Sequence, residues 1–540
     1  MEAFSCCDCI HLDVPDAETI GPPQPSDDAA AGVAPALDDG RKEISGLGDR
    51  SRSFRDERME NRQLEVDTEI MRGIPVAVTL FRCGRLWRSS PLDMEEAERS
   101  KLWELSTPVS GFDIFLSHTW VTKDKWKIVS LLFQFGWPVA SVCWFLGLAL
   151  AFVLGSSGLL PMPWTYTRGV LHFQAPCPFG PWAFFMSLAA LFVGIILSPY
   201  ILTMLGMSPV CFLDLVSIHQ SDPELSERGI YGLGGFLRSS KELHVLWSPE
   251  YLSRLWCVFE LAAFRKANPF GAIRLKPIFR ERQIVWLLVG SYFAAFSFYL
   301  PFWLSYWMGE DLTKSLGAPA IRMLVVSPIF FVFHANRKYM REKHQLIAAL
   351  GSFELKNAEC RLEEDREFVL SAIAAWYGSS EAFVEYVRGP LRRELAASAT
   401  DLPLKYALLV VSAPMTISFD VQLALWRGGA PIEVVLSEAI GSGLAWVGFW
   451  SLVTLKLAWF LCYRFASPAS TRWRDYGVSA VIFLIFFIFW FAGALISDMI
   501  YTTSLWGGVG LACFTLLLAV GAYSKSCCCL MVRSTDAAIR

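Results

Sequence analysis

The segment Ser248-Pro-Glu-Tyr-Leu-Ser-Arg-Leu-Trp-Cys-Val-Phe-Glu-Leu261, termed the Trp-Cys segment, decides the fold of this chain. Trp256 and Cys257 follow Ser253 by three and four residues, and Glu260 follows it by seven. Residues at these spacings share one face of a helix. The segment therefore predicts a helix with a carboxylate beside an indole, at the start of the stretch 253–266.

Apolar strands and helices alternate around the Trp-Cys segment. Short, nearly continuous apolar runs are typical of strands that are buried on both faces of a parallel sheet. The candidate strands are Phe112–His118, Val210–Val216, Leu243–Trp247 and the shorter Ile273–Ile278. The helical stretches between them are 123–135, 229–240 and 253–266. This alternation predicts an α/β domain with a doubly wound parallel sheet.

Much of the remaining chain is predicted to lie in a membrane. Of its 540 residues, 54% are hydrophobic and only 18% are charged, which is too apolar for a soluble enzyme of this size. A membrane span needs about 20 consecutive apolar residues. The clearest such stretches are Gly136–Gly155, Pro181–Leu202, Gln283–Trp307, Gly441–Tyr463, Val478–Ile496 and Trp506–Ala522, and two weaker ones are Leu316–His334 and Leu404–Trp426. The sequence predicts an α-helical membrane bundle of about eight spans.

Charge predicts the orientation of these spans. The stretch Met1–Pro25 has no apolar core long enough for a signal peptide, so the first span is expected to direct insertion, with a cytosolic amino terminus. Basic residues are enriched in the segments that this arrangement puts in the cytosol, such as Arg337–Lys343, and are few in the outer loops. We expect an integral, multi-pass membrane protein with both termini and the α/β domain cytosolic, in a membrane that the sequence does not identify.

These features divide the chain into eight parts. The α/β domain is predicted to assemble from pieces on either side of a transmembrane hairpin, and a second hairpin follows it. The predicted parts are a disordered tail (1–65), the first part of the α/β domain with its preceding segment (66–135), a transmembrane hairpin (136–207), the second part of the α/β domain (208–282), a second hairpin (283–334), a cytosolic helical segment (335–403), a four-span membrane region (404–523) and a Cys-rich cytosolic tail (524–540).

Cysteines cluster near both ends of the chain. Cys527, Cys528 and Cys529 directly follow the last predicted span, where reversible palmitoylation is expected. For Cys6, Cys7 and Cys9, palmitoylation and chance clustering are equally good explanations.

The Trp-Cys segment resembles, without a gap, the plant-type TIR (Toll/interleukin-1 receptor) pattern S-x-x-Y-x-S-S-x-W-C-L-x-E-L, and Phe112–Ser117 is similar to the first strand of that family. The resemblance covers roughly residues 111–135 and 208–280. It implies a flavodoxin-like TIR sandwich with a parallel sheet, here interrupted by transmembrane hairpins, and self-association during signalling. Two departures from the pattern matter: Arg254 replaces a serine, and 217–222 differs from the usual loop after the second strand.

Some members of this family hydrolyse NAD at the nicotinamide glycosidic bond, and the resemblance implies a catalytic role for Glu260. A carboxylate beside a ribose can stabilise an oxocarbenium-like transition state. Asp214 could supply a second carboxylate, although nothing in the sequence fixes that pairing. Alternatively, Trp256 and Leu261 are core residues and Glu260 lies at the rim of the sheet. NAD is thus a candidate substrate, and no cofactor is predicted.

The candidate substrate-binding residues are Ser117, His118 and Trp120, together with Trp256. The first three lie at the carboxyl end of the first strand, where open α/β sheets bind ligands, and an indole there could stack on a base. Trp120 could equally pack, with Trp126, at the membrane surface.

The sequence sets two classes of ligand aside. His118, His219 and Asp222 have spacings that match no closed metal site, so no metal is predicted. The net charge of −3 and the scattered basic residues argue against a nucleic-acid partner.

These sequence features support three hypotheses about function. The leading one is a membrane-anchored TIR-like signalling or scaffold protein that binds other copies or TIR partners. The second is the same protein acting as an NAD glycohydrolase through Glu260. The third is a channel or transporter regulated by the TIR-like domain, for which Asp420 and Lys456 are the candidate intramembrane charges. Their depths differ, since Asp420 lies 16 residues from the inner end of its span and Lys456 seven.

Overall fold

The structure is a computed structural model, and it describes residues 64–88, 94–122, 124–303, 327–399, 402–468 and 470–524. Helices dominate, and they accompany one six-stranded sheet and one two-stranded sheet. The predicted tail 1–65, except for its last two residues, and the three cysteines Cys527, Cys528 and Cys529 lie outside the described residues.

The large sheet has the strand order β2-β1-β6-β3-β7-β8. Its core is parallel: β3 pairs with β6 on one side and with β7 on the other, and β7 pairs with β8. Two short strands extend the β6 edge in antiparallel fashion, so the sheet is mixed, which corrects the prediction of a wholly parallel one. The strands are β1 (Arg72–Pro75), β2 (Thr107–Pro108), β3 (Phe112–Ser117), β6 (Val210–Phe212), β7 (Ser240–Val245) and β8 (Ala272–Leu275).

Both faces of the parallel core are covered, which explains why the sequence of β3 is nearly all apolar. Successive side chains point to opposite faces, so Phe115 packs in one apolar cluster and Ile114 and Leu116 in the other. One face is covered by α2 (Val76–Thr79), η3 (Arg85–Trp87), α7 (Asp214–Ser217) and the first turns of α5 (Asp124–Ser156). The other is covered by α9 (Leu233–Arg238) and α10 (Leu255–Ala267).

The helical segment after residue 327 contributes to this second apolar cluster from Leu346 onward. Phe368, Ile373 and Phe383 are buried in it, and Phe368 lies 5.9 Å from Phe259 of α10 between ring centroids. Its elements are α15 (Pro328–Gly351), η7 (Leu355–Asn357), α16 (Glu363–Tyr377), α17 (Ser380–Tyr386), the π-helical turn η8 (Val387–Leu391) and α18 (Arg392–Ala399). These apolar side chains therefore form the face of the segment that packs on α10.

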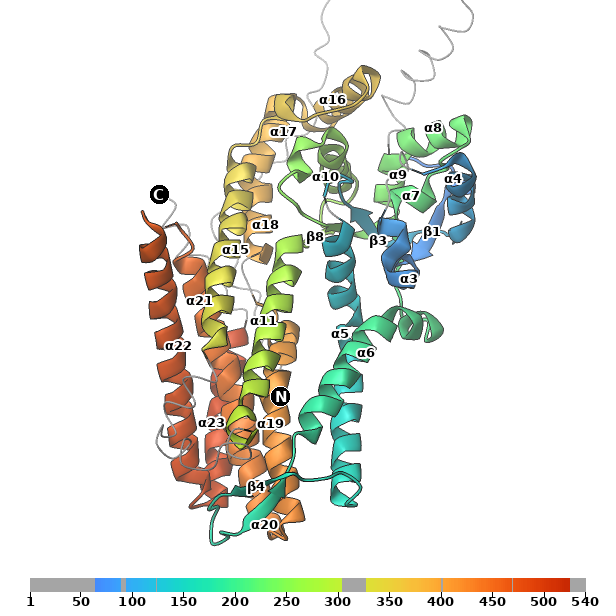
Figure 1. The fold of residues 1–540 in the computed structure, drawn as a ribbon. Helices are drawn as coiled ribbons and strands as arrows, with labels where there is room; N and C mark the ends of the chain where they lie inside the picture. The colour runs from blue at the N-terminus through green and yellow to red at the C-terminus, as the bar shows by residue number, and fades with distance from the viewer. Residues whose placement is uncertain are drawn as a thin grey trace, which may run out of the picture. The chain divides into compact units, whose positions relative to one another are not determined.

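Seven helices in the described residues are long and apolar enough to cross a membrane, as a multi-pass membrane protein requires. They overlap seven of the eight predicted spans; the other, Leu316–His334, falls largely on residues 304–326, outside the described part. Figure 1 shows α5 beside α6 and the later helices bundled together. The seven are α5, α6 (Trp182–Met204), α11 (Ile278–Ser297), α19 (Leu404–Arg427), a continuous helix made of α20 (Ile432–Ser437), the π-helical η9 (Glu438–Trp450) and α21 (Ser451–Arg464), α22 (Arg472–Tyr501) and α23 (Leu505–Tyr523).

The remaining elements are short. A hairpin of β4 (Trp164–Thr167) and β5 (Pro176–Phe179) joins α5 to α6, in the predicted outer loop. The others are η2 (Thr68–Ile70), α3 (Phe81–Gly84), α4 (Glu96–Leu102), η5 (Trp103–Leu105), α8 (Pro223–Tyr231) and η6 (Tyr251–Ser253).

Candidate functional site

Glu260 lies on α10 at the carboxyl end of β3, the central strand of the parallel core. The hydroxyl of Ser117, the last residue of β3, donates a hydrogen bond to the Glu260 carboxylate. The hydroxyl of Tyr251 in η6 is hydrogen-bonded to the same Ser117 hydroxyl, and its oxygen lies 3.4 Å from the backbone carbonyl oxygen of Cys257. Three residues of the Trp-Cys segment thus close over the end of β3.

The start of α10 is fixed by a second part of the chain. The backbone N–H of Leu255 donates to the carbonyl of Glu359 at 3.0 Å, and the N–H of Glu359 donates to the carbonyl of Ser253 at 2.6 Å. Arg254 occupies the N-cap with an extended backbone and no side-chain cap. This short bridge sets where the helix begins, and so sets the position of Glu260 relative to β3.

The surroundings of Glu260 favour its neutral form. Burial raises the pKa of the Glu260 carboxyl to about 8. The hydrogen bond from Ser117 lowers this pKa, and the charge of Asp214 raises it. Burial likewise raises the pKa of Tyr251. At neutral pH the half-buried Glu260 side chain is therefore mostly protonated, and Asp214 lies near enough to influence it.

A second group at the end of β3 joins His118, Trp120 and Asp214. The Trp120 indole N–H donates to Asp214 Oδ2 at 2.9 Å, and His118 Nε2 lies 3.4 Å from Asp214 Oδ1. The His118 ring is held edge-on between Trp87 and Trp120, at centroid distances of 5.0 and 4.7 Å. Trp120 is thus part of this group.

The pKa values of His118 and Asp214 are both lowered, for different reasons. Burial lowers the pKa of His118, so its ring is neutral at pH 7. Burial alone would raise the pKa of Asp214, but the contact with His118 and hydrogen bonds from Trp120 and the Leu215 N–H lower it, and Asp214 stays ionised. The end of β3 therefore carries an ionised carboxylate, Asp214, and a mostly neutral carboxyl, Glu260, whose charges interact.

Trp256 lies away from these residues. Its ring packs against Phe259 and Phe368, at 5.4 and 6.2 Å between centroids, and its indole N–H donates to Asp365 of α16 at 3.4 Å. The structure therefore brings Ser117, His118 and Trp120 to the same strand end as Glu260, while Trp256 helps to hold α16 on α10.

Two residues of this site were missed from the sequence. Tyr251 belongs to the Trp-Cys segment, and its place in that pattern was the available signal. Lys127 is buried, donates to the Thr119 carbonyl at 2.6 Å and lies 5.1 Å from the centre of the Trp120 ring. Its only signal was a basic residue early in a helix that becomes a membrane span.

His219 and Asp222, which were considered as metal ligands, form hydrogen bonds within the fold. His219 Nδ1 accepts the N–H of Asp222 at 2.9 Å, and the Asp222 carboxylate caps the start of α8. Within the described ranges, no three His, Cys, Asp or Glu side chains gather in a way that could hold a metal.

The two candidate transport charges have separate surroundings. The buried Asp420 carboxylate accepts the backbone N–H groups of Ala183 and Phe184 at 2.7 and 3.2 Å and the Tyr299 hydroxyl at 2.7 Å. It therefore caps the start of α6 from a neighbouring helix. Lys456 lies with its ammonium 4.5 Å from the centre of the Tyr523 ring.

No family model, curated protein or solved structure matches this chain. The function is therefore argued from the geometry of this site and the pattern of its sequence.

Proposed function

We propose that this chain is a membrane-anchored TIR-like signalling or scaffold protein, whose cytosolic α/β domain acts by binding other copies or TIR partners. The observation that carries the proposal is the order of the four parallel strands, β6-β3-β7-β8. In chain order this is second, first, third, fourth, which is the flavodoxin-like order up to its fourth strand. The sequence pattern of the TIR family implies the same order.

The Trp-Cys segment supports the proposal independently of strand order. Its tyrosine and glutamate meet Ser117, the final residue of the strand that resembles the first TIR strand. Two separate parts of the family pattern, 134 to 143 residues apart, therefore meet in one set of hydrogen bonds. A chance resemblance at either part would not require this contact.

Two features distinguish this domain from a simple flavodoxin-like sheet. After β8 the chain enters α11, a candidate membrane span, and the described sheet has no fifth parallel strand beyond β8. At the opposite edge, β1 and β2 extend the sheet. We infer that the domain is built into the membrane bundle, so that association of copies could be coupled to the packing of the spans.

The α10–β8 loop carries a candidate contact for association. Phe270 is fully exposed there, next to the edge strand β8 of the large sheet. An exposed phenyl ring next to a sheet edge is suited to packing against a second copy. The test is energy transfer between differently labelled full chains in liposomes, comparing Phe270→Asp with Leu362→Asp, a substitution of another exposed apolar residue. We expect Phe270→Asp alone to weaken transfer.

The second candidate function is NAD glycohydrolysis, supported by Glu260 and Asp214, whose charges interact at the end of β3. Most glycosidases cleave a glycosidic bond with two carboxyl groups, one protonated and one ionised. The test is nicotinamide release by the full chain in liposomes with NAD, after clustering by antibody. Release that is lost in Glu260→Ala but kept in Glu250→Ala, an exposed residue of the same segment, would establish the enzyme. Absence of release under clustering would remove this candidate.

A further inference from the structure

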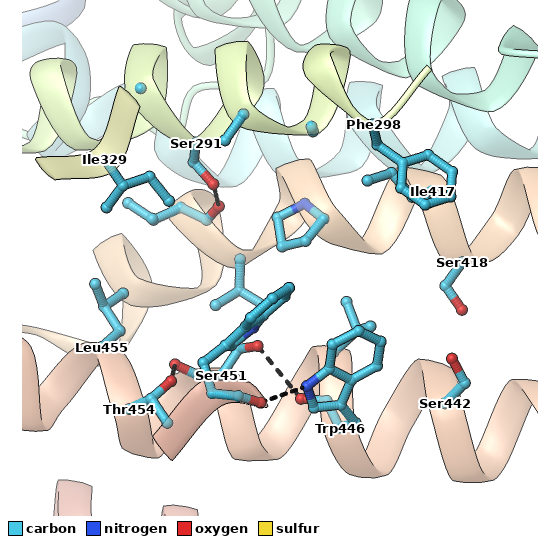
Figure 2. A pocket seen from close by; sticks show the side chains of 18 of the residues that line it. Ser291, Phe298, Ile329, Ile417, Ser418, Ser442, Trp446, Ser451, Thr454 and Leu455 are labelled. Carbon is cyan, nitrogen blue, oxygen red and sulfur yellow. Dashed lines mark hydrogen bonds between the residues drawn. The ribbon is translucent and has the colours of Figure 1, made fainter. Parts of the chain in front are cut away.

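A cavity of about 400 Å³ lies inside the helical bundle, between α11, α15, α19, the continuous η9–α21 helix and α22. Its volume is in the range of sites that enclose drug-sized ligands. Figure 2 shows Ser418 of α19 and Ser442 of η9 on opposite walls, with their hydroxyl groups directed toward the space between them.

Most of the cavity wall is apolar. Such a wall offers few oxygen ligands to a bare ion, which would lose its hydration without compensation. It favours a molecule with an apolar body. The apolar lining residues include Leu287, Phe298, Ile417, Val447, Leu455 and Phe486.

One part of the wall carries a buried carboxylate. Glu438, the first residue of η9, lines the cavity and is 1% exposed. Ser442 and Tyr501 lie beside its carboxylate, yet its Oε2 atom has no hydrogen-bond partner among the described residues. A buried carboxylate oxygen without a donor is costly, so a ligand that brings a donor to this position would be stabilised.

The charges near Glu438 include more carboxyl groups than cations. Arg168, which also lines the cavity, forms an ion pair with Asp498 and donates to the Tyr166 hydroxyl at 3.2 Å. The Arg168 guanidinium also interacts electrostatically with Glu438, so two carboxyl groups, those of Asp498 and Glu438, share one guanidinium. The polar end of the cavity therefore suits a positively charged head.

We propose that this cavity binds a lipophilic amine, with its apolar body among α11, α19 and α22 and its ammonium group at Glu438. This site is separate from the end of β3, and the inference does not depend on the function proposed for the α/β domain. It assigns to the helical bundle a ligand-binding role that could change the packing of the spans to which that domain is joined.

The test uses the full chain in phosphatidylcholine nanodiscs and a photoreactive dodecylamine that carries a diazirine. Probes with the same alkyl chain and an alcohol or a carboxylate head serve as comparisons. We expect the amine to label peptides of α19 and η9 more than the other two probes do. Unlabelled dodecylamine should compete with it, and dodecanol should not.

Two variants sharpen the result. Glu438→Gln should reduce amine labelling by about tenfold or more, because a hydrogen bond to a charged group is typically worth that much. Glu433→Gln, an exposed glutamate on the same continuous helix, should leave it unchanged. Ser418→Phe, which narrows the cavity and keeps Glu438, should reduce labelling as well.

Equal labelling by the three probes would overturn the proposal, as would amine labelling that persists in both Glu438→Gln and Ser418→Phe. If Glu438→Gln does not fold, competition between probes on the natural chain still tests the proposal. Displacement of the amine probe by dodecanol as readily as by dodecylamine would contradict a site for a positively charged head.

Discussion

The Ser117 hydroxyl at the end of β3 donates a hydrogen bond to the carboxylate of Glu260 on α10. This contact joins the central strand of the sheet to the Trp-Cys segment, 143 residues later in the chain. Between the two residues, the chain passes through α5 and α6, both candidate membrane spans. The contact can therefore form only when these spans have returned the chain to the sheet.

Stability should fall with rising pH because of Glu260. Its pKa in the folded chain is about 8, above the ordinary value of 4.5, so the folded state holds this proton more tightly than the unfolded state. The stabilisation is complete below the ordinary pKa and is lost progressively as pH rises to about 8. Glu260→Gln should flatten this slope in thermal unfolding followed by tryptophan fluorescence between about pH 5 and about pH 8. The control Glu250→Gln should keep the slope of the natural chain. The same slope in Glu260→Gln would contradict this prediction.

If Glu260 acts in NAD cleavage as an ionised carboxylate, nicotinamide release should increase with pH. The reason is that an anion stabilises a developing oxocarbenium ion, whereas the protonated carboxyl that predominates at neutral pH does not. The expected profile rises with a midpoint near the Glu260 pKa of about 8. Steady-state release rates across this range test it. A profile that falls over the same range would indicate that Glu260 acts as a general acid instead.

Asp420 is predicted to be structural. Asp420→Ala would leave the N–H groups of Ala183 and Phe184 and the Tyr299 hydroxyl without their acceptor, at a cost of about 1–3 kcal/mol for each buried group. Asp420→Asn keeps one acceptor oxygen and should cost less. Thermal unfolding of the two variants compares them. Equal stability of both variants and the natural chain would contradict the capping role, and ion or solute flux in liposomes that survives Asp420→Asn would show this carboxylate dispensable for transport.

The membrane topology gives a prediction of its own. Leu159, in the loop between α5 and β4, is 72% exposed, and Cys83 is exposed beside the large sheet. Leu159→Cys should react with an impermeant maleimide from outside intact cells, whereas Cys83 should react only after permeabilisation. Labelling of both positions from the same side would contradict the predicted hairpin formed by α5 and α6.

Sequence patterns predicted the elements that are locally encoded. β3 and β7 carry dense apolar runs because both of their faces are buried, and the spans are long apolar stretches. β1 was missed because it has four residues, including a glycine and a proline, with no periodic pattern. Its pairing with β6 depends on distant residues: a Cβ at Gly73 would lie 2.8 Å from Val210 Cγ1. Such a close approach has no local signal.

The candidate site was predicted only in part, because some of its contacts also depend on distant residues. Helical spacing correctly put Cys257 and Glu260 toward one side of α10, but it also grouped Trp256 with them. Which face Trp256 uses is decided by α16, whose residues lie more than 100 positions later and offer Phe368 and Asp365 as partners. Asp214 was a candidate without a partner, and only the meeting of β3 and β6 brings it to His118 and Trp120.

The central claim, that the α/β domain acts by associating with other copies, is tested most directly by counting chains per particle. Singly labelled full chains in liposomes, examined by stepwise photobleaching, should contain more than one copy in most particles at high protein density. In Phe270→Asp, the association constant should be lower by about tenfold, which is the usual effect of losing an aromatic contact at the centre of an interface. Single chains at every density, with no difference between the natural chain and Phe270→Asp, would contradict the claim.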